Sequence, residues 1–219
     1  MGYGFQLEVW GDYGLFSRPE LKVERVSYDI ITPSSARGIL EAIYWHPGMK
    51  YVIDKIHIYN EPVFTNIRRN EVSEKIMASA MESLMNGNSK AKEFMVTSEV
   101  IQQRASLVLK NVRYVIEAHF DMTEQAGKDD TKEKFYNIAL RRMRKGQFYH
   151  MPYMGCREFP ANFRFIEGEI PISELKGTRD FGIMLYDLDY SDSEDIQAVF
   201  FRAIMKDGVV DLTNVELLR

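Results

Sequence analysis

Two segments that lie far apart in the chain alternate between apolar and polar residues with a period of two. In residues 3–10 the apolar side chains stand at odd positions, as Phe5 and Leu7 do. In residues 112–122 they stand at even positions, as Ile116 does. Because successive side chains of a β-strand point to opposite faces of its sheet, each segment predicts a strand with one buried face. We therefore expect a sheet with one covered face at the centre of the fold.

Two helical patterns separate the predicted strands. Thr32 followed by Pro33 is typical of a helix start, with Thr32 as the N-cap, and an apolar stripe at helical spacing follows. Asp130 and Glu133 form a capping-box pattern that predicts the start of a second helix. With further strands at residues 51–59 and 157–166, the order is strand, helix, strand, strand, helix, strand. This order predicts an α+β fold of the ferredoxin-like kind, which the RNA-recognition motif shares.

The pattern also predicts how the chain is divided. We expect residues 1–168 to form the ferredoxin-like, RNA-binding domain, with inserted β-hairpins at about residues 62–109. Residues 169–219 read as a small antiparallel β-domain. The pair Asp207-Gly208 in that region is typical of a type I′ turn between two strands.

Charge is unevenly distributed along the chain. The formal net charge of -4 and the pI near 5.7 do not by themselves favour a nucleic-acid partner. Between residues 131 and 147, however, all charged residues except Glu133 are basic, whereas those between 187 and 195 are all acidic. We interpret the first region as a surface for RNA and the second as a surface for a protein partner, with two solvated faces as the alternative.

Several classes of protein are disfavoured. The single cysteine, Cys156, leaves no disulfide within the chain. No apolar run approaches the ~20 residues of a membrane helix, and the first ten residues lack a secretory signal pattern. Neither a zinc spacing nor a glycine-rich phosphate motif is present. We therefore expect a cytoplasmic protein with no membrane partner, no bound metal and no cofactor.

Seven short motifs, in order along the chain, resemble one family. They occupy residues 16–20, 34–45, 66–71, 103–105, 115–120, 155–160 and 184–187. From about residue 5 to residue 190 the sequence is similar to the CRISPR-associated Cas-five family of the Dvulg subtype, also called type I-C. That family belongs to the repeat-associated RNA-processing superfamily.

The resemblance implies an endoribonuclease that binds the repeat hairpin of precursor crRNA. It implies metal-independent cleavage, in which a ribose 2′-oxygen attacks the adjacent phosphate. The protein then stays on the 5′ handle of the mature crRNA as a subunit of a surveillance complex. Its implied partners are the type I-C backbone and large subunits, with duplex DNA as a further candidate.

The resemblance also implies catalytic residues. The family's tyrosine corresponds to Tyr44 and its lysine to Lys134. The family's histidine position holds Phe135, whose ring cannot transfer protons. The candidates for a substitute acid or base are His46, His119 and His150.

Basic side chains neutralise backbone phosphates, so they are the natural candidates for RNA contacts. The candidates are Arg37, Arg68, Arg69, Arg104, Arg113, Lys132, Arg141, Arg142 and Arg157.

Two other functions remain open from the sequence. Phe135 favours a non-catalytic scaffold that holds the 5′ handle. Glu117, His119 and Asp121 project from one face of a predicted strand, a pattern that also fits a metal-dependent DNA nuclease. We expect cleavage in EDTA to separate these functions.

Overall fold

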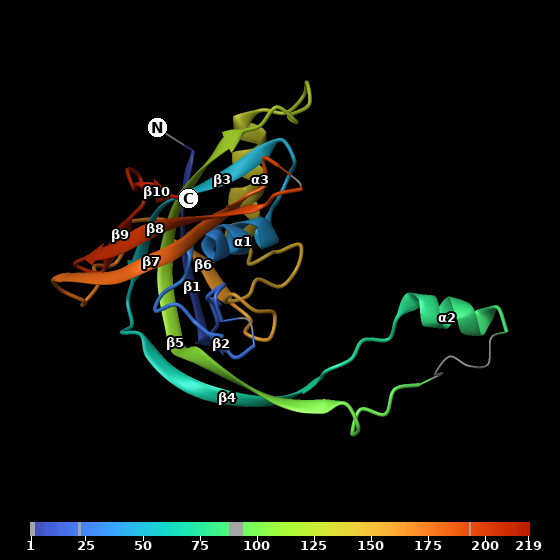
Figure 1. The fold of residues 1–219 in the computed structure, drawn as a ribbon. Helices are drawn as coiled ribbons and strands as arrows, with labels where there is room; N and C mark the ends of the chain where they lie inside the picture. The colour runs from blue at the N-terminus through green and yellow to red at the C-terminus, as the bar shows by residue number, and fades with distance from the viewer. Residues whose placement is uncertain (1–2, 22, 88–93, 193) are drawn as a thin grey trace. The chain divides into compact units, whose positions relative to one another are not determined.

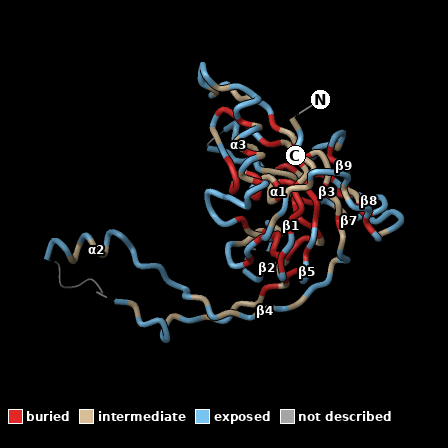
Figure 2. The backbone as a smooth tube through the Cα atoms, turned by 180° about the vertical axis from the view of Figure 1, so that it is seen from behind, coloured by how far each residue is buried: buried red, intermediate tan, exposed pale blue. Residues whose placement is uncertain are grey.

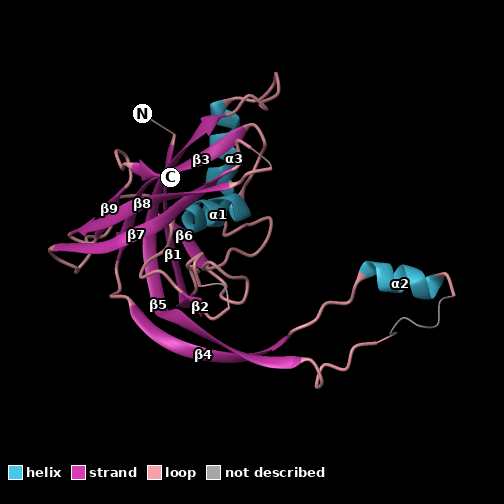
Figure 3. Cartoon of the chain, viewed as in Figure 1, coloured by secondary structure: helices cyan, strands magenta, loops and turns pink. Residues whose placement is uncertain are grey.

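The computed structural model describes residues 3–21, 23–87, 94–192 and 194–219. The chain divides into two compact units, which are described separately. The larger unit comprises residues 1–65 and 107–219, and the smaller unit comprises residues 66–106. Figures 1 and 3 show the elements of both units.

The larger unit is built around four antiparallel strands and two helices. In chain order these are β1 (Gly4–Gly14), α1 (Pro33–Ile43), β3 (Met49–Ile58), residues 107–122 of β5 (Ile101–Met122), α3 (Lys132–Arg144) and β6 (Asn162–Phe165). Across the sheet the strands lie in the order β3, β5, β1, β6. A two-residue strand, β2 (Arg25–Val26), also pairs with β5. The predicted mixture of helices with a large antiparallel sheet is confirmed.

The helix starts follow from local chemistry. At α1 the Thr32 side chain accepts a hydrogen bond from the backbone of Ser35, as predicted for an N-cap. At α3 the prediction is wrong by one residue: Thr131, not Asp130, is the N-cap, and its hydroxyl accepts from the backbone of Lys134. Threonine caps a helix with its side chain just as aspartate does, so the pattern alone did not distinguish the two. Asp130 is thereby left for another role.

The two faces of the sheet differ in what covers them. Phe5 stacks on Tyr136 of α3, with 5.1 Å between ring centroids, so the side of β1 that carries Phe5, Leu7 and Val9 faces the helices. We call this the helix face. Leu7 and Val9 are fully buried there, and Figure 2 shows buried residues concentrated in β1 and β5. Because side chains alternate, Gln6, Glu8 and Trp10 lie on the opposite face, which we call the outer face.

The C-terminal strands extend the same sheet. They are β7 (Thr178–Asp189), β8 (Gln197–Lys206), β9 (Val209–Asp211) and β10 (Leu217–Leu218), and β9 pairs with β3. Both Asp207 and Gly208 adopt positive φ, at 50° and 81°, which is what the predicted type I′ turn requires. The position also excludes a side chain, since a Cβ on Gly208 would lie 2.4 Å from Ser173. A separate domain over residues 169–219 stays a prediction.

The smaller unit contains most of β4 (Val63–Val72), which pairs with β5, and α2 (Ala78–Met85). No residue of α2 is buried, so packing adds little to its stability. None of the helices in the described ranges is long and apolar enough to cross a membrane.

Candidate active site

Tyr44 lies where the C-terminus of α1 meets α3. It is the C-cap residue of α1, and its backbone N–H donates to the carbonyl of Leu40 at 3.0 Å. The Arg142 guanidinium lies over the Tyr44 ring, 5.4 Å from its centroid, and also donates to the carbonyl of Ile43 at 2.9 Å. Arg142 therefore ties the end of α1 to α3 and fixes the position of the tyrosine.

Two opposing effects act on the Tyr44 hydroxyl. Burial raises the pKa of Tyr44, while the positive charges of Lys134 and Arg142 lower it by less. The pKa therefore stays above the ordinary tyrosine value, and the hydroxyl is protonated at neutral pH. In that state it is a hydrogen-bond donor rather than a base.

Lys134 is held beside this site by Asp130. Its ammonium donates to Oδ1 of Asp130 at 2.8 Å, and the backbone of Gly127 donates to Oδ2 at 2.9 Å. The hydrogen bond with Asp130 raises the pKa of Lys134, so the lysine is cationic at neutral pH. The same hydrogen bond, followed by that from Gly127, lowers the pKa of Asp130. About half of the Lys134 side chain is exposed, so a bound phosphate can reach the cation.

His46 occupies the space next to Phe135. Phe135 is fully buried, and its ring centroid lies 4.7 Å from that of His46 and 6.4 Å from that of Tyr44. Nδ1 of His46 accepts a hydrogen bond from the backbone of Gly48 at 3.0 Å, so the proton of the neutral ring lies on Nε2. Nε2 in turn lies 4.0 Å from Oδ2 of Asp130. The histidine is thus oriented by its backbone contact and faces the carboxylate that holds the lysine.

The other two candidate histidines make different contacts, although the backbone N–H of His150 donates to the carbonyl of Ala42 in α1 at 3.3 Å. His119 is on β5, on the face opposite Ile116 and Ala118, and its Nδ1 lies 2.9 Å from Asp54. His150 is exposed in the loop after α3, where its ring lies 6.1 Å from that of Tyr149 and 6.4 Å from that of Tyr153. Of the three, His46 is the one in ring contact with Phe135.

The candidate metal ligands do not form a cluster. Glu117 pairs with Nε2 of His57 at 2.6 Å, while His119 pairs with Asp54. Within the described part of the chain, no three histidine, cysteine or acidic side chains are grouped to hold a metal ion. This geometry lends no support to a metal-dependent nuclease.

Several of the candidate RNA contacts have structural partners, and Arg37, Arg113 and Arg142 are described first. Arg37 donates to Glu41 at 2.7 Å and to Asp187 at 2.8 Å, which joins α1 to β7. Arg113 is hydrogen-bonded to Glu8, and Arg142 holds the end of α1 as described.

The remaining candidates are spread over both units. Lys132, Arg141 and Arg157 are exposed in the larger unit. In the smaller unit Arg68 is exposed, and Arg69 and Arg104 are half-buried.

Sequence reasoning missed the role of Asp130. It read this residue as part of a helix cap, whereas the carboxylate bridges Lys134 and His46. The four-residue spacing of Asp130 and Lys134 was a usable signal, because it can bring an acidic residue just before a helix next to a lysine in the first helical turn.

Comparison with known proteins shows the family to which this chain belongs. Residues 4–213 match the family described as CRISPR-associated protein (Cas_Cas5). The chain belongs to this family. It is 46% identical over 217 residues to the CRISPR pre-crRNA endoribonuclease Cas5d of Mannheimia succiniciproducens, covering 97% of this chain and 96% of that protein. It is 43% identical over 185 residues to the protein of the same name from Thermus thermophilus, covering 84% of this chain and 73% of the relative.

Solved structures share the fold. A functionally uncharacterized protein from Streptococcus mutans superposes with a TM-score of 0.69 at 22% identity, covering 96% of this chain and 92% of that one. A chain of a CRISPR RNA-guided surveillance complex superposes with a TM-score of 0.52 at 12% identity, covering 95% and 89%.

Proposed function

We propose that this chain is a metal-independent endoribonuclease that cuts precursor CRISPR RNA at its repeat hairpin and then stays on the 5′ handle. Two relatives with 46% and 43% identity are named as pre-crRNA endoribonucleases, which supports this activity. The observation that carries the proposal is the grouping of Tyr44, His46 and Lys134 around Asp130 at the junction of α1 and α3.

These residues match the needs of the reaction. When the 2′-oxygen bonds to the adjacent phosphorus, the bond to the 5′-oxygen breaks, leaving a 2′,3′-cyclic phosphate and a 5′-hydroxyl. The step needs a base for the 2′-hydroxyl, a cation for the charge on the phosphorane, and a donor for the departing oxygen. We assign these roles to His46, Lys134 and Tyr44, respectively. Because Nε2 of His46 already carries a proton, His46 takes the 2′-hydroxyl proton at Nδ1, and the hydrogen bond from Gly48 to Nδ1 opens in this step.

The assignment follows from the state of each group. Imidazole is the side chain suited to proton transfer near neutral pH. Lys134 is cationic and half-exposed, as stabilisation of the phosphorane requires. Tyr44 keeps its proton because its pKa is raised, so it can donate that proton to the 5′-oxygen. His46 thus supplies, from the end of α1, the imidazole that the family resemblance places at the position of Phe135.

We further propose that the strands β1, β3, β5 and β6 with helices α1 and α3 form a ferredoxin-like, RNA-binding core. The strand order β3, β5, β1, β6 supports this, because it is the order of the split βαβ arrangement. The likeness of the fold to a surveillance-complex chain fits a protein that joins a backbone and a large subunit in the cytoplasm.

A non-catalytic scaffold is the second candidate. It is favoured by Phe135, which is fully buried and holds no proton to transfer. In that case the protein holds the 5′ handle, while Tyr44 and Lys134 only contact RNA.

Single-turnover cleavage of a repeat-hairpin RNA in EDTA tests the proposal. We expect the unmodified protein to cut, and Lys134→Ala to cut about 10²-fold more slowly or worse, which is the effect of removing one electrostatic stabiliser. Lys206→Ala, which removes the same charge from β8, is the matched control and should cut normally. Binding without cutting by the unmodified protein would favour the scaffold, and equal rates for both lysine variants would place the active site elsewhere.

A further inference from the structure

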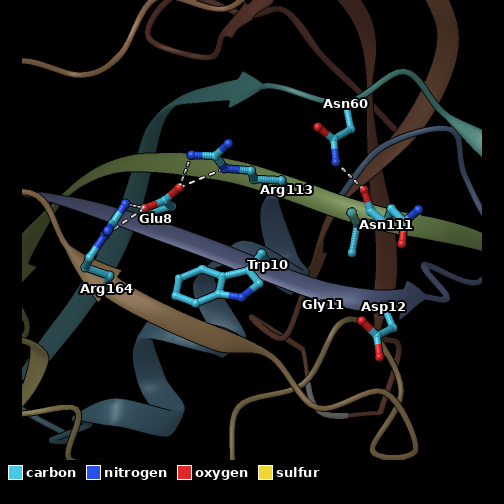
Figure 4. Close-up of a pocket in the computed structure, with 9 residues that line it drawn as sticks. Glu8, Trp10, Gly11, Asp12, Asn60, Asn111, Arg113 and Arg164 are labelled. Atoms are coloured by element: carbon cyan, nitrogen blue, oxygen red, sulfur yellow. Dashed lines mark hydrogen bonds and ion pairs between the residues drawn. The ribbon is translucent and has the colours of Figure 1, made fainter.

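A cavity lies on the outer face of the sheet, away from Tyr44. It has a volume of about 360 Å³ and is lined mainly by Glu8, Trp10, Asp12, Asn60, Arg113 and Arg164. Figure 4 shows these side chains over β1 and its neighbouring strands. The volume lies near the lower end of the usual range for small-ligand sites, about 300–1,000 Å³. The cavity therefore suits a single small group rather than a helix or a duplex.

An exposed aromatic ring stands in this cavity. Trp10 pairs through its backbone with Arg113 on β5 and with Asn162 on β6, so it lies on an inner strand of the sheet. It is 37% exposed, although its neighbour Val9 is fully buried on the helix face. An indole on an open sheet face is a stacking platform for a base, and single-stranded RNA is commonly bound in this way.

The buried carboxylate of Glu8 holds two arginines beside the ring. Arg113 donates to Oε1 of Glu8 from Nε at 2.8 Å and Nη2 at 2.6 Å. Arg164 donates to Oε2 from Nε at 2.9 Å and also from Nη2. Glu8 is only 4% exposed, so its two partners are held in fixed orientations.

Glu8 leaves the two arginines able to bind an anion. Burial raises the pKa of Glu8, but the hydrogen bonds and the positive charges of Arg113 and Arg164 together lower it by more, and the carboxylate is ionised at neutral pH. One negative charge then faces two positive charges. A guanidinium carries five N–H donors, and each arginine spends only Nε and Nη2 on Glu8, so further donors remain. Such preoriented donors are well suited to a phosphate.

We propose that this cavity binds one unpaired nucleotide of RNA, with its base stacked on Trp10 and its phosphate held by Arg113 and Arg164. Figure 4 shows Trp10 between Arg164 and Asp12. The Asp12 carboxylate repels a phosphate and accepts hydrogen bonds from base N–H groups, so the base lies toward Asp12 and the phosphate toward the arginines. The proposal rests on the proposed function in one respect, which is that the ligand is RNA. The cavity and Tyr44 lie on opposite faces of the sheet, so the two sites can be tested separately.

The full-length chain offers a direct optical test. Its only tryptophans are Trp10 and Trp45, so in the Trp45→Phe variant all indole emission comes from the proposed site. This variant is titrated with a ten-nucleotide oligouridylate and with a repeat hairpin carrying a single-stranded 5′ extension. Binding is followed in parallel by the anisotropy of a dye on the RNA. We expect the emission of Trp10 to be quenched along the same curve as the anisotropy.

Substitutions then measure the contribution of each contact. Trp10→Ala should weaken binding about tenfold, which is typical of the loss of one stacked base, and Trp10→Phe should retain most of the affinity. Arg164→Gln should weaken binding and reduce the log–log salt slope by about 0.7, the value for one phosphate of a single strand. Arg202→Gln is the matched control, because it removes a similarly exposed and ion-paired arginine from β8 and should change neither quantity.

The results separate this site from the proposed activity. Constant Trp10 emission at saturating RNA, or equal affinity of Trp10→Ala and the unmodified protein, would overturn the site even if the hairpin is cut. Quenching and a tenfold loss in Trp10→Ala, in a protein that does not cut in EDTA, would support the site and contradict only the endoribonuclease.

Discussion

Replacement of His46 by asparagine is the sharpest test of the proposed chemistry. Asparagine places its carbonyl oxygen close to the position of Nδ1, so it can still accept the hydrogen bond from the backbone of Gly48. It cannot exchange a proton near neutral pH. The variant therefore removes acid–base chemistry while it keeps the local structure.

The magnitude follows from the contacts. A positioned acid or base typically contributes 10²–10⁴-fold, so we expect His46→Asn to cut at least about 100-fold more slowly. The cost in stability should be small: even the full loss of the bond to Gly48 would cost about 0.5–1.5 kcal/mol. RNA affinity should change little, because His46 is only partly exposed and phosphate contacts come from other residues.

The assay is single-turnover cleavage in EDTA across pH 5–9, together with affinity and thermal unfolding of the same samples. General-base catalysis makes the cleavage rate depend on pH, so the unmodified protein should show an inflection in its pH–rate profile. His46→Asn should lose that inflection. If His46→Asn cuts at the normal rate with the normal pH profile, the reasoning is refuted, and His150 becomes the next candidate. A slower rate with an unchanged inflection would also contradict a role in proton transfer.

Two further predictions concern buried groups. Phe135→His places a polar ring in a fully buried apolar site, which should destabilise the fold by about 1–3 kcal/mol. Thermal unfolding should therefore show a Tm lower by several degrees. Cleavage should gain little, because His46 already supplies an imidazole beside Phe135. In the folded protein the pKa of Glu8 lies below its ordinary value. The pairing of Glu8 with Arg113 and Arg164 therefore stabilises the fold fully above about pH 4.3, the pKa of an unperturbed glutamate. This stabilisation is lost as the pH falls through the lowered pKa of Glu8 in the folded state. Urea unfolding should therefore show Glu8→Gln to be less stable at pH 7 and the difference to shrink in acid; a constant difference would contradict this.

Local chemistry was enough to predict the elements of the fold. The alternation in residues 112–122 identified part of β5, and the sequence Thr32-Pro33 located the start of α1. The full length of β5, Ile101–Met122, was not predicted, because its first half does not alternate as cleanly. Strand β6 is shorter than the predicted 157–166, since only four residues pair with β1.

The sites were harder to predict from the sequence, because they depend on packing between distant segments. The sequence alone did not choose the substitute acid or base among His46, His119 and His150. Only the packing of α1 on α3 places His46 against Phe135. On the outer face, the cluster of Glu8 and its arginines draws on three strands whose register no local pattern specifies.

The position of β1 has a consequence for how the protein is made. β1 is flanked by β5 and β6, and its register joins Gly4 to His119. As translation proceeds at about 5–20 residues per second, β1 waits on the order of ten seconds before its first partner strand leaves the ribosome. During that time an apolar strand with two open edges is exposed, which favours pairing with other nascent chains. We therefore expect the yield of folded protein to depend on chaperones that cover the N-terminal strand during synthesis.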